Sequence, residues 1–170
     1  IVYTVMGSCL ILNSLCLWVF SFGTNILEGG TADLVSYFSI APIVFLILIP
    51  AITMRTFAEE ARTGTIELLF TRPISDYQIV LAKFFASLSL VMIAIFPTLI
   101  YYVSVNFLGD PVGIVDDGVT VASFLGLILV GAAFVAIGIF ISSITSNQII
   151  ALIMAVVVCW FAFIGFDLLA

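Results

Sequence analysis

"MRTFAEEARTGTIELLFTRPISDYQIVLAK", residues 54–83, contains all four basic residues of the chain and lies between long apolar runs. The whole chain has 170 residues, of which 64% are hydrophobic and only 8% are charged. A soluble domain is typically about one quarter charged, so this composition excludes that class. We therefore expect an all-α fold, a polytopic membrane helical bundle in which this segment connects two membrane helices.

Five apolar runs are long enough to cross a membrane, because a spanning helix needs about 20 apolar residues. They are residues 1–22, 37–54, 84–107, 122–141 and 149–166. Prolines within two of the runs, Pro42 and Pro50 in the second and Pro97 in the third, are compatible with spanning helices, which kink against their neighbours. The chain starts at Ile1 and ends at Ala170 in an apolar context, so we expect a piece of a longer protein.

The basic residues predict the orientation of these spans. Arg55, Arg62, Arg72 and Lys83 all lie between the second and third runs. Cytoplasmic connections carry an excess of Lys and Arg, so residues 55–83 are predicted to face the cytoplasm. The acids predicted on the outer side are Glu28, Asp33, Asp110, Asp116, Asp117 and Asp167.

Several kinds of site have no suitable residues in this sequence. Histidine is absent, and the three cysteines, Cys9, Cys16 and Cys159, lie in apolar runs, which disfavours zinc and redox sites. No phosphate-binding GxxxxGK[ST] motif occurs, so any ATP hydrolysis must take place on a separate chain. No ionisable residue lies mid-span, which disfavours an ion-coupled carrier. We expect no enzymatic activity, no cofactor, no metal and no nucleic-acid partner.

The first half of the polar segment is predicted to be a helix that continues the second span to about Ala61. Arg55 and Glu59, and Glu59 and Arg62, are spaced to form ion pairs on one helix face. Gly64 then suits a left-handed C-cap. Thr65 follows it as the predicted cap of a short amphipathic helix at 66–71, which presents Ile66, Leu69 and Phe70.

The second half of the segment returns the chain to the membrane. The residue before Pro73 is forced out of the helical region, which ends the short helix. Ser75 and Gln78 form a predicted capping box, with Asp76 in the first turn of the next helix. Two interpretations remain: a structured loop on the membrane surface, or a docking element that transmits force from a cytoplasmic partner into the membrane.

"PAITMRTFAEEARTGTIELLFTRPISDYQIVLAKF", residues 50–84, resembles the region after the second transmembrane helix of ABC-2 type permeases. Three further stretches resemble the gliding-motility-associated permease subunit of gliding Bacteroidetes. They are "LIYYVSVNFLGDPVGIVDDG", "VAIGIFISSITSNQIIA" and "FIGFDLLA", which start at residues 99, 135 and 163. Members of the ABC-2 type have six spans, so the resemblance implies five here and a sixth in the full chain.

The resemblance also implies a function and a set of coupling residues. The chain would be the transmembrane subunit of an ATP-driven ABC-2 type transporter, an exporter in a bacterial plasma (inner) membrane. Its partners would be a cytoplasmic ATP-binding subunit, a second permease subunit and membrane lipid. The implied coupling residues are Arg55, Glu59, Glu60, Arg62, Gly64, Thr65, Glu67, Leu69, Phe70, Pro73, Ser75 and Asp76. The alternative is a non-transporting scaffold that anchors a cytoplasmic protein.

The fourth predicted span carries small residues at spacings that let helices approach closely. They are Gly131, Ala132, Ala136, Gly138 and Ser142. This face is predicted to pack either against another span of the same chain or against a second permease subunit. Ser146 or Asn147 is the predicted cap of the fifth span.

Overall fold

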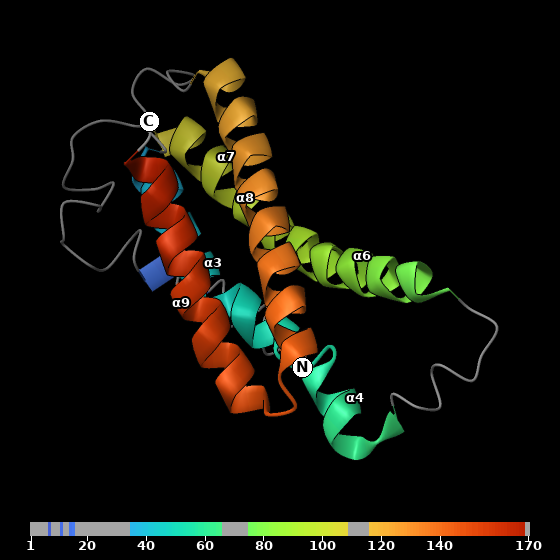
Figure 1. The fold of residues 1–170 in the computed structure, drawn as a ribbon. Coiled ribbons are helices and arrows are strands. Elements are labelled where there is room, and N and C mark those ends of the chain that lie inside the picture. The colour runs from blue at the N-terminus through green and yellow to red at the C-terminus, as the bar shows by residue number, and fades with distance from the viewer. Residues whose placement is uncertain are drawn as a thin grey trace. The chain divides into compact units, whose positions relative to one another are not determined.

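The computed structural model describes residues 35–65, 75–108 and 116–168, and the single residues Gly7, Ile11, Ser14 and Leu15. The regular structure within these residues is entirely helical (Figure 1). The helices are α3 (Val35–Thr53), α4 (Ala58–Thr63), α6 (Asp76–Ile95), η1 (Phe96–Thr98), α7 (Leu99–Leu108), α8 (Asp117–Ile144) and α9 (Gln148–Asp167). The predicted all-α class is confirmed.

Four stretches are long and apolar enough to cross a membrane: Tyr37–Thr63, Asp76–Phe107, Asp117–Ile144 and Gln148–Gly165. Three of the five apolar runs in the sequence lie within them, and a fourth, residues 149–166, extends one residue beyond the last stretch. The first run, residues 1–22, lies outside the described residues except for four isolated positions. The described residues therefore have the helices expected of a polytopic membrane protein.

Two of these helices begin at side chains that accept hydrogen bonds from the first helical turn. Asp116 Oδ1 accepts from the backbone N–H of Gly118 at 2.9 Å, at the start of α8. Asn147 Oδ1 accepts from the N–H of Ile149 at 3.0 Å, at the start of α9. Each oxygen satisfies a donor that has no partner within its helix. Asn147, one of the two residues predicted to cap the last span, is thus the one that does so.

The third predicted span is interrupted near its middle. Pro97 lies in η1, a single 3-10 turn between α6 and α7. A proline inside a helix removes one backbone donor and its ring displaces the preceding turn. The Thr98 hydroxyl donates to the Ile95 carbonyl at 2.6 Å, satisfying an oxygen beside this interruption. The proline that the sequence shows in this run therefore alters the helix locally without ending it.

Contacts within the chain divide it into two units, residues 1–44 with 90–130 and residues 45–89 with 131–170. In the first unit, aromatic rings join α3 to α8. The ring of Phe124 lies 5.0 Å from that of Phe38 and 6.0 Å from that of Tyr37, between centroids. The second unit contains the end of α3, all of α4, the start of α6, the end of α8 and α9. It holds most of the charged residues considered below.

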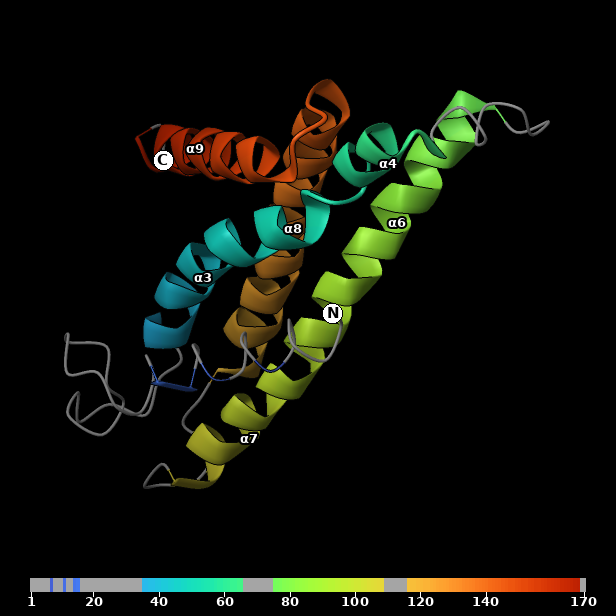
Figure 2. The ribbon, with the colours of Figure 1, turned by 90° about the horizontal axis from the view of Figure 1, so that it is seen from below.

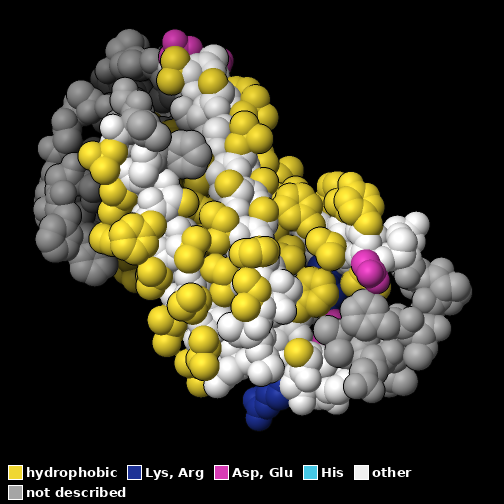
Figure 3. All heavy atoms as spheres, in the orientation of Figure 1, with side chains coloured by type: hydrophobic (Ala, Val, Ile, Leu, Met, Phe, Trp, Pro, Cys, Tyr) yellow, Lys and Arg dark blue, Asp and Glu magenta, His cyan; other side chains and the backbone are white. Residues whose placement is uncertain are grey.

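Many large apolar side chains on α6 and α9 are exposed. Examples are Phe85 and Met92 on α6, and Ile153 and Phe161 on α9. Hydrophobic side chains are spread over the helical surface on the face shown in Figure 3. Such surfaces suit helices that contact lipid tails, since hydrocarbon imposes no penalty on exposed apolar groups.

Candidate functional site

The junction between α3 and α4, residues 53–58, is not the continuous helix that the sequence predicted. Helix α3 ends at Thr53, a turn covers residues 54–57, and α4 starts at Ala58 (Figure 2). The Thr56 N–H donates to the Thr53 carbonyl at 3.1 Å, which tightens the chain after α3. The prediction of one helix to about Ala61 was therefore wrong, and the cause lies in another part of the sequence.

Ser142 of α8 supplies the hydrogen bonds that this break requires. Its hydroxyl accepts from the N–H groups of Phe57 and Ala58 and donates to the Met54 carbonyl, each at 3.1 Å. A hydroxyl offers one donor and two acceptor positions, so all three are used. Ser142 is only 1% exposed. Phe57, the N-cap residue of α4, has no side-chain oxygen, so Ser142 caps this helix in its place.

Gly138 lies one turn before Ser142, on the same face of α8. A Cβ atom at this position would lie 2.1 Å from Thr53 Oγ1 and 2.9 Å from Thr53 Cβ. Thr53 is fully buried, and its hydroxyl donates to the Ile49 carbonyl at 3.0 Å. The absence of a side chain at Gly138 therefore allows α8 to approach the end of α3 closely.

The predicted small-residue face does not have one uniform environment. Gly138 and Ser142 contact the α3–α4 junction of the same chain. Gly131 is buried and Ala132 is half-buried, whereas Ala136 is exposed. Packing within the chain thus accounts for Gly138 and Ser142.

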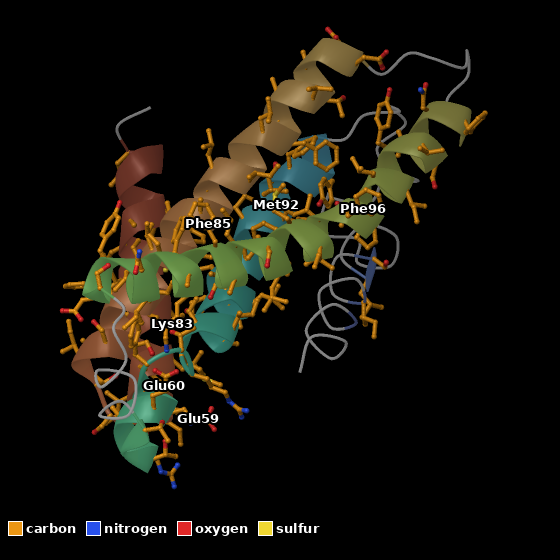
Figure 4. All side chains as sticks on the ribbon, turned by 90° about the vertical axis from the view of Figure 1, so that its right-hand side faces the viewer. Glu59, Glu60, Lys83, Phe85, Met92 and Phe96 are labelled. Carbon is orange, nitrogen blue, oxygen red and sulfur yellow. The ribbon has the colours of Figure 1, made fainter. Side chains whose placement is uncertain are left out.

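Lys83 of α6 holds the same junction from a different direction. Its ammonium group lies 2.6 Å from Glu60 Oε2, donates to the Thr56 carbonyl and lies 4.1 Å from the ring centroid of Phe57. The side chains of Lys83 and Glu60 are 16% and 34% exposed. In Figure 4, Lys83 and Glu60 lie between α6 and α4. Three kinds of contact therefore converge on one partly buried charge.

The ion pairs predicted from helical spacing do not form. Within the described residues, Glu59 makes no ion pair with Arg55 or with Arg62, and the pair that forms is Lys83–Glu60. The turn at 54–57 removes Arg55 from the helix that carries Glu59, so their spacing no longer brings them together. Glu59 and Arg62 are exposed on α4, and Arg55 is exposed on the turn.

The end of α4 agrees with the sequence prediction. Gly64 adopts the left-handed conformation, with φ 71° and ψ 6°. This conformation is costly for residues with a Cβ, so the glycine suits the end of the helix. The Thr65 hydroxyl lies 3.0 Å from that of Thr63 and so turns back toward α4. The predicted helix at 66–71 lies outside the described residues, as do Glu67, Leu69, Phe70 and Pro73.

The start of α6 also lies close to its predicted position. The helix begins at Asp76, which lies in the first turn. The Gln78 side chain accepts from the Ser75 N–H at 3.3 Å, which is half of the predicted capping box. The Gln78 N–H donates to the Ser75 carbonyl at 2.9 Å instead of pairing with the serine hydroxyl.

Sequence reasoning missed Lys83 and the capping role of Ser142. The sequence pattern uses Lys83 only as one of four basic residues that predict the membrane orientation. It uses Ser142 only as one of five small residues that predict close helix packing. Neither contact follows from local spacing, since Ser142 is 84 positions from Ala58 and Lys83 is 27 positions from Thr56. Among the described residues, no group of three or more His, Cys, Asp or Glu side chains is placed to hold a metal ion.

The sequence model of one family, described as ABC-2 family transporter protein, matches residues 5–170. The chain belongs to this family. Searches of curated proteins and of solved structures give no significant match. The chain is thus the multi-pass membrane subunit, or permease, of an ABC transporter. Membership also implies that the permease associates with an ATP-binding subunit.

Proposed function

We propose that this permease converts ATP hydrolysis on a separate cytoplasmic subunit into movement across the membrane. Residues 55–83 would face the cytoplasm, and α4 would form part of the surface that binds the ATP-binding subunit. A second permease subunit would complete the transporter. The clustering of every basic residue in this segment supports its cytoplasmic side, and the resemblance to ABC-2 permeases supports its role.

One observation carries this proposal: other helices contact the first residues of α4, whereas much of the rest of α4 is exposed. Ser142 and Lys83 bind its first residues, and α4 also contacts α9. Glu59, Ala61 and Arg62 remain exposed. A partner that binds these exposed residues would therefore act on an element already connected to the membrane helices.

The finer function that we propose is export from the cytoplasm across a bacterial inner membrane. Residues 99–118, 135–151 and 163–170 resemble the gliding-motility-associated permease subunit, so we propose this branch for the chain. Reading frames beside the gene provide a test, since an adjacent ATP-binding subunit would support the transporter and gliding-machinery genes would support the branch. Neighbours that include neither would contradict both assignments.

Copurification tests the docking surface directly. Tagged permease coexpressed with its neighbouring ATP-binding subunit is expected to retain that subunit through purification in detergent. Glu59→Lys reverses an exposed charge of α4 and is expected to reduce recovery of the subunit at least several-fold. Glu60→Lys is a poorer probe, because it would also break the ion pair with Lys83.

Glu28→Lys is the matched control, an identical charge reversal in the connection predicted on the opposite side of the membrane. It is expected to leave recovery of the ATP-binding subunit unchanged. Equal recovery with wild type, Glu59→Lys and Glu28→Lys would exclude α4 as the docking surface. Absence of the subunit from the wild-type preparation would favour the scaffold.

A further inference from the structure

The junction between α3 and α4 receives its hydrogen bonds from helices that are distant in sequence. Ser142 of α8 binds backbone groups of Met54, Phe57 and Ala58. An isolated turn between two helices would leave these groups to water or to local side chains. Here one buried hydroxyl joins the carbonyl after α3 to the first N–H groups of α4.

Lys83 of α6 holds the same four-residue turn at different atoms. It donates to the Thr56 carbonyl, contacts the Phe57 ring and pairs with Glu60 one turn into α4. Ser142 and Lys83 thus bind different groups of the junction. Together they contact both the turn and the helix that follows. A displacement of α4 alone would break contacts to α8 and to α6.

Among the described residues, the opposite end of α4 makes no hydrogen bond or ion pair to another helix. The hydroxyl of Thr63 bonds to the Glu59 carbonyl at 2.8 Å, and that of Thr65 contacts Thr63. These contacts stay within α4 and its own cap. The helix is therefore fastened at its start, near Ala58, and exposed at the end that reaches Gly64.

We infer that Ser142 and Lys83 are positioning residues that make α4 move as one body with the adjoining ends of α3, α6 and α8. This inference rests on the proposed function, because it assigns the route by which a displacement of α4 reaches the membrane helices. The ATP-binding subunit supplies the displacement, and the two side chains transmit it. Neither residue touches the ATP-binding subunit in this assignment.

Distances between spin labels test the rigid attachment. Thr63→Cys on α4 and Ile144→Cys on α8 place labels at two exposed positions outside the proposed docking residues, with Cys9, Cys16 and Cys159 replaced by alanine. The complex with the ATP-binding subunit is measured without nucleotide and after trapping with ATP and vanadate. With Ser142 and Lys83 present, the expected label distance is the same in both states.

The variant Ser142→Ala with Lys83→Met is expected to broaden the distance distribution and to make its mean shift between the two states. Ser143→Ala is the matched control, since this neighbouring exposed hydroxyl bonds only to the Phe140 carbonyl of its own helix. Lys83→Arg, combined with native Ser142, is expected to restore the nucleotide-independent distance. A purely structural loss of stability would lower the yield without making the distance depend on nucleotide.

Two outcomes overturn the inference. One is a label distance in the double variant that stays as narrow and as independent of nucleotide as in the parent. The other is a parent distance that already shifts between states. Should the double variant not fold, Ser142→Ala and Lys83→Met are measured singly against the same criteria. Should no ATP-binding subunit copurify with the native permease, the proposed function fails, and the width of the distribution in the permease alone still tests the attachment.

Discussion

Two positions on one face of α8 define the contact with the end of α3. Gly138 has no side chain where Thr53 lies, and Ser142 has a short hydroxyl where three backbone groups need partners. Residues four apart lie one above the other on a helix, so both features act on the same neighbour. Small residues commonly allow membrane helices to approach closely. Here the hydrogen bonds of Ser142 also fix which backbone groups α8 contacts.

Gly138→Ala is expected to destabilise the permease, because its Cβ would overlap both the hydroxyl and the Cβ of Thr53. Overpacking of this kind typically costs about 1–3 kcal/mol. Gly126→Ala is the matched control in the same helix, where an added Cβ would meet nothing within 4 Å. The midpoint of thermal unfolding in detergent should fall for Gly138→Ala and hold or rise slightly for Gly126→Ala.

Thr53→Ala should recover part of this loss when combined with Gly138→Ala, since it removes the nearest of the overlapping atoms. Equal unfolding midpoints for the two glycine variants would contradict the close approach of α8 to α3.

Single residues could be predicted from sequence where their role is local. Gly64 has a left-handed conformation and Asn147 caps a helix, and both act on backbone within a few positions. Ser142 acts on backbone 84 positions away, so no local pattern distinguishes it from the neighbouring Ser143. Lys83 pairs with Glu60 and not with an acid of its own helix for the same reason.

At the scale of elements, α4 is notable because it has only six residues. Helices shorter than about 12 residues are marginal in water, so its helicity depends on its ends and its neighbours. Ser142 satisfies its first N–H groups, and Gly64 allows the chain to leave the helix at its other end. The element is thus maintained by contacts that can be removed one at a time.

Two substitutions at Gly64 test whether its left-handed backbone conformation is needed for binding of the ATP-binding subunit. Gly64→Asn should keep binding of the ATP-binding subunit near wild type, since asparagine tolerates the left-handed region. Gly64→Val should weaken it, because a β-branched residue opposes the observed φ of 71°. No Cβ clash confounds the comparison, as an added Cβ would meet nothing within 4 Å. Retention of the subunit by Gly64→Val would show that the end of α4 does not matter for docking.

The long helices could be predicted from runs of apolar residues, because hydrocarbon favours uninterrupted helices of about 20 residues. Their starts at Asp76 and Gln148 lie beside polar residues that the sequence shows plainly. The break at residues 54–57 could not be predicted, since the local sequence suits a helix and the competing partner, Ser142, is on α8. The end of α3 thus combines a local bond, from Thr56 to the Thr53 carbonyl, with the distant ones from Ser142.

At the scale of the whole molecule, charge is segregated along the chain. All basic residues and four of the acids lie between residues 55 and 83, and the remaining six acids lie elsewhere, so the net charge of −6 falls outside that segment. The described helices alternate with polar connections, as in a multi-pass membrane protein. If residues 55–83 face the cytoplasm, α4 is placed where an ATP-binding subunit can reach it.

Accessibility of single cysteines tests this placement most directly. Arg62→Cys on α4 and Val119→Cys at the start of α8 are both exposed positions, here in the cysteine-free background. A membrane-impermeant thiol reagent is added to spheroplasts, before and after permeabilisation. We predict that Val119→Cys reacts at once and that Arg62→Cys reacts only after permeabilisation. Reaction of Arg62→Cys in intact spheroplasts would contradict the cytoplasmic position of α4 and, with it, ATP-driven coupling through this helix.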